Sequence, residues 1–566
     1  MRQWRANLVL FLIFFVGAVI IYRLFSLQII QHDLYAALAS GQQKYFLKTQ
    51  GERGEIFFKN YNLPLATEKT SYFAYLSPEE TPREEKERVA RLLSELIGIK
   101  EQVLLEKIQK NSLYELVAEK IDEATGQKVK EAQLPGVHIG EEKMRDYPYQ
   151  SFASRLLGFV NKDGAGQYGL EEYWNDILSG KENYLEGERG PLGYLFSYKD
   201  AASNEGSDIV LSIDYNIQYM AEKLLSAAAN QLNAEGGAII VINPQTGEIM
   251  ALAEWPNYDA NKYAVVDDLS VFKVGSIQGV FEPGSVFKPL TMAAALNEGD
   301  ITPQTTYFDP GVLEIGGWPI YNYDQRVYPG EITMTGVLEK SINTGAVFAE
   351  QRVGHKKFLE YIKRFGIFEK TGVDLAGEIL PQNNEFRKGY EINFATASFG
   401  QGIEMTPMQL VRAFSVIANG GKLITPHLVK EIKNSDNKTI EREPSDARDG
   451  IISAGTSQKL AAMLVSVVEN GFGKAAKIPG YYVAGKTGTA QVSWSSMGVS
   501  KSGYSDKTWQ SFIGFAPAFN PRFLILVKLD NPATKTAEYS ATPIFRDLAK
   551  YIIDYYQIPP DYEETF

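Results

Sequence analysis

The chain has 566 residues, of which 44% are hydrophobic and 22% are charged, so it is long enough for two or three globular domains. Its formal net charge is −12, and an acidic chain without a basic block argues against a nucleic-acid partner. Cysteine is absent and the four histidines are scattered. This excludes disulfides, thiolate zinc sites and cysteine nucleophiles, and we expect neither a metal nor a cofactor.

An apolar segment opens the chain. Leu8 to Leu27 comprises twenty residues, enough to cross a bilayer core of roughly 30 Å at about 1.5 Å per residue. Arg2 and Arg5 precede it and predict a cytoplasmic N-terminus. A cleaved signal peptide is the alternative, since Ala37-Leu38-Ala39 has a small-x-small pattern, but a polar stretch separates it from the apolar run. We predict residues 1–7 in the cytoplasm, a single-pass anchor in the cytoplasmic (inner) membrane at 8–30, and a periplasmic or extracytoplasmic remainder.

Residues 31–205 form one region that is rich in charge and in helix signals. Thr81-Pro82-Arg83-Glu84 predicts a capping box with proline at the first helical position. Apolar residues then follow at helical spacing, and Gly98 predicts the helix end. We interpret this region as an elongated α+β pedestal without catalytic residues, which holds the next domain away from the membrane.

Residues 206–566 show a different order of patterns. A buried strand at 237–242, a turn cluster and a returning strand at 248–253 predict a hairpin. Helical patterns follow at 285–297, 334–352 and 406–418, and strand patterns return at 481–484, 511–515 and 523–529. This order predicts an α+β domain with helices packed on both sides of an antiparallel sheet that is built from both ends of the segment.

The first candidate motif runs from Phe281 to Lys288. Pro283-Gly284 predicts a turn, and a helix is expected to start near Ser285. Ser285 and Lys288 then share one helix face, and the hydroxyl lies where the helix dipole favours a developing alkoxide. A neutral amine beside a serine can remove its proton. Alone the pattern is weak, because a serine N-cap followed by a solvated lysine looks the same.

The second candidate motif is Ser341-Ile342-Asn343. A hydroxyl and a carboxamide two residues apart can both enter a site from a loop, where the hydroxyl relays protons and the amide holds a peptide group. Alone it is nearly uninformative, because both residue types cap helices.

The third candidate motif is Lys486-Thr487-Gly488-Thr489, within an alternating run that predicts a strand. Gly488 allows a ligand to approach the backbone, Lys486 supplies charge, and the threonine hydroxyls can bind a carboxylate. Lys370-Thr371-Gly372 repeats the letters without a strand pattern, so we assign Lys370 a structural role.

Ser-x-x-Lys, Ser-x-Asn and Lys-Thr-Gly in this order are typical of penicillin-binding proteins and class A β-lactamases. The chain resembles a class B penicillin-binding protein from end to end. The stretches that carry the resemblance are Tyr22 to Gln28, Arg53 to Ile56, Arg145 to Pro148, Gly169 to Glu171, Thr246 to Ala251, Phe281 to Pro289 and Ala484 to Ala490. Ser398 to Gly402 and Met405 to Gln409 resemble division-type members more than elongation-type ones.

The resemblance implies a peptidoglycan D,D-transpeptidase that acts in septal or elongation wall synthesis. Ser285 would form an acyl-enzyme with a D-Ala-D-Ala stem peptide, and an amine of a neighbouring stem peptide would resolve it. The implied catalytic residues are Ser285, Lys288 as base, Ser341 as proton relay and Lys486 as electrostatic assistant. The implied substrate-binding residues are Asn343, Thr487, Gly488 and Thr489, with the backbone N–H groups of Ser285 and Thr489 as oxyanion hole.

The resemblance also implies partners. β-Lactams mimic D-Ala-D-Ala and would acylate Ser285. No glycosyltransferase domain fits in the remaining length, so we expect a SEDS-family glycosyltransferase and other division or elongation membrane proteins as partners. We also expect none of the C-terminal accessory repeats of some relatives. Three alternatives stay open: a D,D-carboxypeptidase or β-lactamase-type hydrolase, a β-lactam sensor or division scaffold without activity, and a conventional Ser-His-Asp hydrolase.

Overall fold

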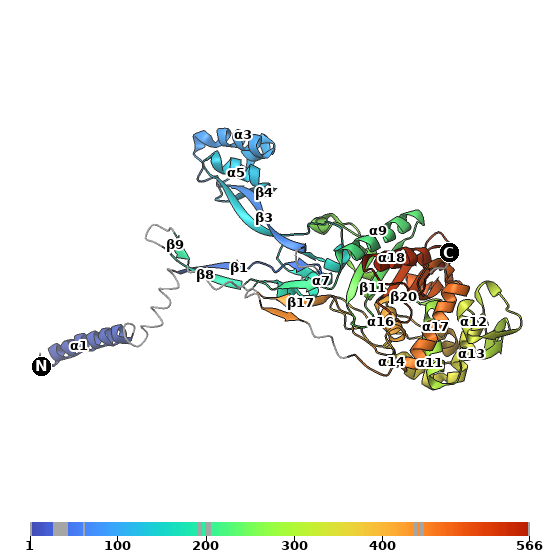
Figure 1. Ribbon diagram of the computed structural model, residues 1–566. Coiled ribbons are helices and arrows are strands. Elements are labelled where there is room, and N and C mark those ends of the chain that lie inside the picture. The colour runs from blue at the N-terminus through green and yellow to red at the C-terminus, as the bar shows by residue number, and fades with distance from the viewer. Residues whose placement is uncertain are drawn as a thin grey trace. The chain divides into compact units, whose positions relative to one another are not determined.

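The computed structural model describes residues 3–26, 44–59, 63–180, 182–189, 195–198, 205–434, 438–441 and 447–563 (Figure 1). Its internal contacts divide the chain into two units. The first contains residues 1–53 and 179–206, and the second contains 54–178 and 207–566.

The described residues of the first unit form a helix and a small sheet. Helix α1 spans Gln3–Phe25. Strands β1 (Lys44–Gln50), β8 (Glu182–Arg189) and β9 (Leu195–Tyr198) form an antiparallel sheet in the order β1-β8-β9. Within the described ranges, no helix is both long and apolar enough to cross a membrane. The last residues of the anchor predicted at 8–30 lie outside the described ranges. The possible cleavage site at 37–39 also lies outside them.

The second unit contains a seven-stranded sheet, which combines strands from its N-terminal part with three strands from later in the chain. Strand β5 pairs with β3, beside a path in the order β18-β17-β10-β2-β3-β4. The strands are β2 (Ile56–Phe57), β3 (Pro64–Leu76), β4 (Glu115–Ile121), β5 (Val137–Asp146), β10 (Asp208–Leu211), β17 (Val429–Lys433) and β18 (Thr439–Glu441). The helices around it are α3 (Lys86–Ile97), α4 (Glu101–Ile108) and α5 (Glu123–Glu131), and their apolar faces form one cluster with Leu76.

The capping box predicted at Thr81 is wrong. A 3-10 turn at Arg83–Glu85 precedes α3, its N-cap is Pro82, and no side chain caps it. The Thr81 hydroxyl instead donates to the Ser77 carbonyl at 3.0 Å. The predicted helix end is confirmed, because Gly98 follows α3 in the left-handed conformation that glycine adopts without steric cost.

Three stretches named in the resemblance meet in a buried ion pair. Arg145 and Glu171 have side chains that are 3% and 0% exposed, and their Nε and Oε1 atoms lie 2.7 Å apart. Arg145 Nη1 also donates to the Gly54 carbonyl at 2.8 Å. A buried charge needs such partners. Two stretches that are distant from Arg145 in sequence supply them in the fold.

The α+β prediction for residues 206–566 is confirmed by a five-stranded antiparallel sheet in the order β12-β11-β21-β20-β19. The strands are β11 (Gly236–Ile242), β12 (Ile249–Trp255), β19 (Ala484–Ser493), β20 (Tyr504–Ala516) and β21 (Phe523–Asp530). Strands β11 and β12 are the predicted hairpin. Strand β19 is an edge strand and begins at Ala484, whereas the pattern predicted a start at Tyr481.

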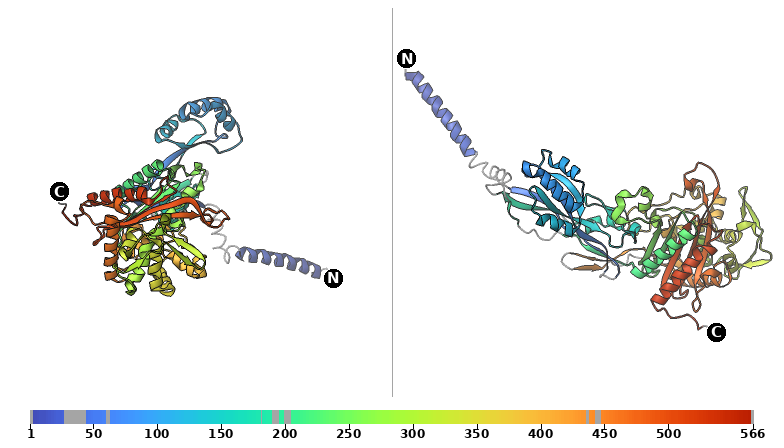
Figure 2. Two further views of the ribbon diagram at one scale, coloured as in Figure 1. Left: turned by 90° about the vertical axis from the view of Figure 1, so that its right-hand side faces the viewer. Right: turned by 90° about the horizontal axis from the view of Figure 1, so that it is seen from above.

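Helices cover both faces of this sheet, as predicted. Alternate residues of β11 point to opposite sides, so Ile240 and Ile242 belong to one apolar cluster while Ile239 and Val241 belong to another. Helices α9 (Tyr215–Gln231) and α18 (Ala541–Tyr555) lie side by side on one face, as the right view of Figure 2 shows. The other face packs against α16 (Pro407–Ala418) and α17 (Ala454–Asn470), and α11 (Lys288–Glu298) packs against these two helices.

Two predicted helices differ in detail from the structure. The helix predicted at 285–297 begins as a 3-10 turn, η5 (Gly284–Phe287), before α11. The single helix predicted at 334–352 is broken into α12 (Met334–Glu339) and α13 (Asn343–Val353). The break lies at Ser341, whose φ of 54° is left-handed and incompatible with a continuous α-helix.

The remaining elements of the second unit are short or peripheral. They include α6 (Ser154–Leu157), α7 (Gly169–Tyr173), α10 (Gly275–Gln278), β13 (Thr306–Phe308), β14 (Val312–Ile315), β15 (Trp318–Tyr321), β16 (Glu331–Thr333), α14 (His355–Arg364) and α15 (Glu391–Ala397).

Candidate active site

Lys288 is the centre of a cluster that joins two of the three sequence motifs. Its Nζ atom lies 3.0 Å from Ser285 Oγ, 2.6 Å from the Ser341 carbonyl oxygen and 2.8 Å from Asn343 Oδ1. Ser341 Oγ lies 3.3 Å from the same nitrogen. The side chain has 0% exposure, whereas Ser285 is only partly buried. A hydroxyl at the edge of the cluster is thus in contact with an amine inside it.

The third motif enters through the edge strand. Lys486 Nζ donates to Ser341 Oγ at 2.9 Å and to the Thr487 carbonyl at 3.1 Å. Ser341 Oγ therefore lies within hydrogen-bond distance of both amines. The predicted residues Ser285, Lys288, Ser341, Asn343 and Lys486 form one continuous hydrogen-bonded chain.

The turn that carries Ser285 packs closely against its neighbours. Gly284 has a φ of 61°, and an added Cβ would lie 2.9 Å from the Cβ of Ala490 on β19. At Gly488, an added Cβ would lie 2.9 Å from Val286 Cγ1 and 3.2 Å from the Pro283 carbonyl oxygen. Both positions require glycine, because any larger side chain would separate the serine turn from the edge strand.

The two threonines of β19 differ in their surroundings. Thr487 Oγ1 lies 3.3 Å from Lys486 Nζ, so its hydroxyl is part of the cluster. Thr489 Oγ1 accepts a hydrogen bond from the Ala537 backbone N–H at 3.1 Å. The Thr489 hydroxyl is therefore already held by the segment between β21 and α18, while its own hydrogen stays available to a ligand.

The environment of the two lysines lowers the pKa of both. Burial, followed by repulsion from Lys486, lowers the pKa of Lys288 well below its usual value of 10.5. Burial lowers the pKa of Lys486 from 10.5 to about 7. A neutral Lys288 can accept the proton of Ser285, while Lys486 can carry charge near neutral pH. The arrangement can therefore activate a serine nucleophile without histidine.

The second Lys-Thr-Gly sequence does not belong to this cluster. The Thr371 backbone N–H donates to Glu378 Oε1 at 2.6 Å, and the Lys370 carbonyl accepts from Arg412 at 3.2 Å. The first bond closes the loop and the second holds it against α16. Within the described part of the chain, no group of three His, Asp or Glu side chains could hold a metal ion.

Several residues around the cluster carry no motif of their own. Asn322 and Asp309 bond to the start of α13, and no local sequence signal distinguishes them. Glu282, by contrast, lies inside the first motif but is not among the residues predicted for the site. It is 6% exposed and accepts from the Tyr504 hydroxyl at 3.0 Å. Burial raises the pKa of Glu282 to about 7.

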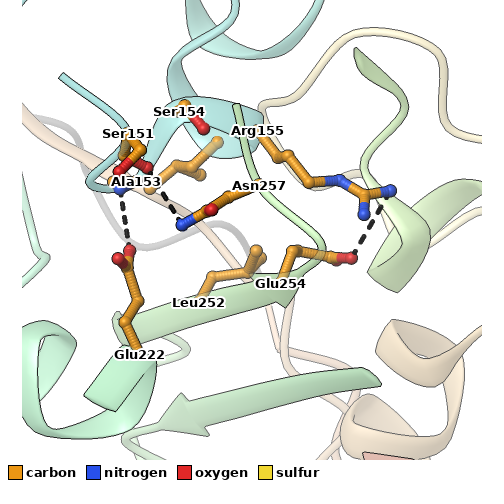
Figure 3. Close-up of a pocket in the computed structure, with 9 residues that line it drawn as sticks. Ser151, Ala153, Ser154, Arg155, Glu222, Leu252, Glu254 and Asn257 are labelled. Carbon is orange, nitrogen blue, oxygen red and sulfur yellow. Dashed lines mark hydrogen bonds and ion pairs between the residues drawn. The ribbon is translucent and has the colours of Figure 1, made fainter. Parts of the chain in front are cut away.

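A polar pocket apart from this cluster lies between residues 151–156 and β12, and two hydrogen bonds to the backbone and one ion pair join the residues that line it (Figure 3). Glu222 accepts from the Ala153 backbone N–H at 2.7 Å, and Arg155 lies 3.8 Å from Glu254. Asn257 donates to the Ser151 carbonyl at 3.3 Å. These bonds hold α6 against the sheet, and the pocket shares no residue with the Ser285 cluster.

Comparisons with known proteins match two separate segments of the chain to family models. The family model described as "Penicillin binding protein transpeptidase domain" matches residues 237–550, and "Penicillin-binding Protein dimerisation domain" matches residues 48–211. Stage V sporulation protein D of Bacillus subtilis is 32% identical over 90% of this chain and 79% of its own length. The probable peptidoglycan D,D-transpeptidase PbpC of Pseudomonas aeruginosa is 34% identical over 76% of this chain and 73% of its own length.

A solved structure extends the likeness to the fold. Penicillin binding protein 3 of Mycobacterium tuberculosis, complexed with aztreonam, superposes with a TM-score of 0.68 at 26% identity. The match covers 91% of this chain and 98% of that one.

Proposed function

The chain belongs to the class B penicillin-binding proteins, and from that premise we propose that it is a serine-type peptidoglycan D,D-transpeptidase with Ser285 as its nucleophile. The observation that carries the assignment of residues is the contact of a fully buried, pKa-lowered Lys288 amine with Ser285 Oγ at 3.0 Å. An amine in that state serves as the base that a serine nucleophile needs.

In the acylation step, Ser285 Oγ attacks the carbonyl carbon of the penultimate D-Ala of a donor stem peptide. Its proton passes to Lys288 Nζ. The peptide bond to the terminal D-Ala breaks, and the leaving nitrogen takes a proton that Ser341 relays from the lysines. The products are an ester on Ser285 and free D-Ala. The hydrogen bonds from both lysines to Ser341 Oγ support this relay.

In the second step, an amine of a neighbouring stem peptide attacks the ester carbonyl. An amide bond forms, the ester C–O bond breaks, and the proton that the amine loses passes through Lys288 to Ser285 Oγ. During the preceding acylation step, Asn343 holds the donor peptide, the Thr487 and Thr489 hydroxyls hold the carboxylate of its terminal D-Ala, and Gly488 leaves room for it. The backbone N–H groups of Ser285 and Thr489 stabilise the developing oxyanion, a contribution of about 10²–10³ in rate for one such donor.

Labelling with a fluorescent penicillin tests this assignment. β-Lactams present a strained amide in place of D-Ala-D-Ala, so wild-type protein should form a stable covalent adduct. Ser285→Ala should form none. Ser453→Ala is the matched control, because Ser453 also starts a helix, as the N-cap of α17, and it should label like wild type. Equal labelling of Ser285→Ala and wild type would refute the proposal, and rapid release of the adduct would favour a hydrolase.

We further infer that the protein works at the outer face of the cytoplasmic membrane in septal wall synthesis, as a division-type member. The relatives include a peptidoglycan D,D-transpeptidase FtsI homolog of Mesostigma viride, 27% identical over 98% of this chain. Residues 8–30 would anchor the chain, since Phe11, Phe14 and Phe15 of α1 are exposed. A SEDS-family glycosyltransferase would supply the glycan strands. Fractionation of cells into membrane and soluble parts tests the anchor, and co-purification tests the partner.

A further inference from the structure

Helix α13, which begins with Asn343, has no cap of its own. Its N-cap residue is Ile342, and an isoleucine side chain cannot accept a hydrogen bond. The first N–H groups of any helix have no partner within it. Here Asn322 provides one, because its Oδ1 accepts from the backbone N–H groups of Asn343 at 3.0 Å and Thr344 at 3.1 Å. The cap of this helix therefore comes from a residue 21 positions away in sequence.

The amide of Asn322 is held in one orientation. The side chain is 4% exposed. Its Nδ2 donates to Asp309 Oδ2 at 2.9 Å and to the Arg326 carbonyl at 3.0 Å. With the nitrogen fixed on two acceptors, the oxygen must face the two N–H groups of α13.

Asp309 is itself held as an acceptor. It accepts from Thr344 Oγ1 at 2.7 Å and from the backbone N–H groups of Tyr328 at 2.9 Å and Gly311 at 3.0 Å. Burial acts to raise the pKa of Asp309, but these hydrogen bonds outweigh it and the pKa is lowered. A carboxylate close to the start of α13 is also favoured by the helix dipole.

The residue beside Asn322 fixes the side chain of Asn343. The Tyr321 carbonyl accepts from Asn343 Nδ2 at 2.8 Å. Because the nitrogen of that amide is occupied, its Oδ1 faces Lys288 Nζ, at 2.8 Å. Tyr321 and Asn322 together hold Asn343 by its side chain and by its backbone, and Asn343 in turn contacts the proposed base.

We propose that Asn322, oriented by Asp309, is a positioning residue for the transpeptidase: it caps α13 across space and so fixes the Asn343 amide with its oxygen on Lys288. The inference rests on the proposed function and extends it to residues outside the three motifs. Without Asn322, the buried N–H of Thr344 and the partly buried N–H of Asn343 lose their acceptor, the first turn of α13 loosens, and the Asn343 amide leaves its place beside Lys288. A displacement of about 1 Å can slow an enzyme about 10²-fold.

A double-mutant cycle on the rate of acylation by fluorescent penicillin tests the proposal in the full-length protein. Asn322→Ala should slow acylation about 10–100-fold. If Asn322 acts through Asn343, the pair Asn322→Ala/Asn343→Ala should be about as slow as Asn343→Ala alone. Costs that multiply in the double variant, or a wild-type rate for Asn322→Ala, would overturn the proposal.

The pH profile of the same reaction separates positioning from loss of stability. An acceptor on Lys288 Nζ favours the protonated amine. Release of the Asn343 amide should therefore move the acid limb of the acylation profile to lower pH, equally in Asn322→Ala and Asn343→Ala. An acid limb that stays in place in Asn322→Ala while it moves in Asn343→Ala would also overturn the proposal.

Three controls keep the result interpretable. Asn419→Ala removes another buried amide, one that bonds Pro244 and Lys422 after α16, and it should keep the wild-type rate and profile. Asp309→Asn is nearly isosteric and covers the case in which Asn322→Ala does not fold. It should slow acylation, and its effect should be non-additive with that of Asn343→Ala in the same way. A wild-type rate for Asp309→Asn would refute the proposal. Ser285→Ala distinguishes the two levels of inference: if it labels normally, the proposed function fails, whereas if only Asn322→Ala behaves as wild type, the positioning role alone fails.

Discussion

Gly400 lies against the serine turn, and adding one methyl group there provides a stringent test of the site. Gly400 has a φ of 79°, and a Cβ at this position would lie 2.2 Å from the Gly284 carbonyl oxygen and 2.7 Å from the Gly284 nitrogen. The Gly284 N–H also donates to the Gly400 carbonyl at 2.9 Å. Because these neighbours are backbone atoms, Gly400→Ala must displace the residue that precedes Ser285.

The chain provides a matched control in Gly299, which follows α11. It also has a φ of 79°, but nothing lies within 4 Å of an added Cβ. The free energy of unfolding of Gly299→Ala should therefore fall only by the backbone cost of the left-handed conformation, about 1–2 kcal/mol. The free energy of unfolding of Gly400→Ala should fall by the same amount and by about 1–3 kcal/mol more, because the added methyl group overpacks the contact.

Thermal unfolding and the rate of penicillin acylation measure the two consequences separately. We expect a lower Tm for Gly400→Ala than for Gly299→Ala, and a rate of acylation that falls about 10²-fold in Gly400→Ala alone. Equal losses of stability together with equal rates in the two variants would refute the reasoning that the Gly284–Gly400 contact sets the position of Ser285.

Three further predictions follow from buried charges. Because burial and Lys486 lower the pKa of Lys288, the acylation rate should rise about tenfold per pH unit in acid and level off well below pH 10.5; a continued rise to pH 10 would contradict this. The pKa of Glu282 is raised from 4.5 to about 7, so Glu282 ionises at lower pH in the unfolded chain than in the folded one. Its contribution to the free energy of unfolding should therefore fall by about 3 kcal/mol as pH rises from 4.5 to 7. In denaturant titrations, Glu282→Gln should lose less stability than wild type over this pH range, and an equal loss would contradict the prediction. Glu171→Ala should cost about 3–5 kcal/mol because it strands Arg145, whereas Lys388→Ala, which breaks an exposed pair, should cost less than about 1 kcal/mol in the same titration.

Local patterns determined much of the fold. The β11–β12 hairpin, α16 and the strands β20 and β21 follow directly from apolar alternation, helical spacing and turn residues. These signals depend on neighbours within a few residues, because the spacing of the apolar residues along a strand or helix shows which of its faces is buried. The three motifs were visible for the same reason, since each is a short run of side chains.

Contacts between distant residues left no such signal. The capping box at Thr81 satisfied the local rule, yet the Thr81 hydroxyl bonds to the carbonyl of Pro135, 54 positions away, as well as to that of Ser77. The spacing of 334–352 favoured one helix, yet Ser341 takes a left-handed φ of 54° and brings its carbonyl and hydroxyl to Lys288. The cost of that conformation is offset by bonds to a residue 53 positions away, which no short window contains.

The sequence by itself determined which side chains are available for chemistry and which local elements carry them. Tertiary structure alone decided that Lys288 and Lys486 are fully buried, which lowers the pKa of each, and that Asn322 and Asp309 hold the start of α13. The physical reason is that desolvation and hydrogen-bond geometry depend on everything that surrounds a group in space. A residue's neighbours along the chain supply only part of that surrounding.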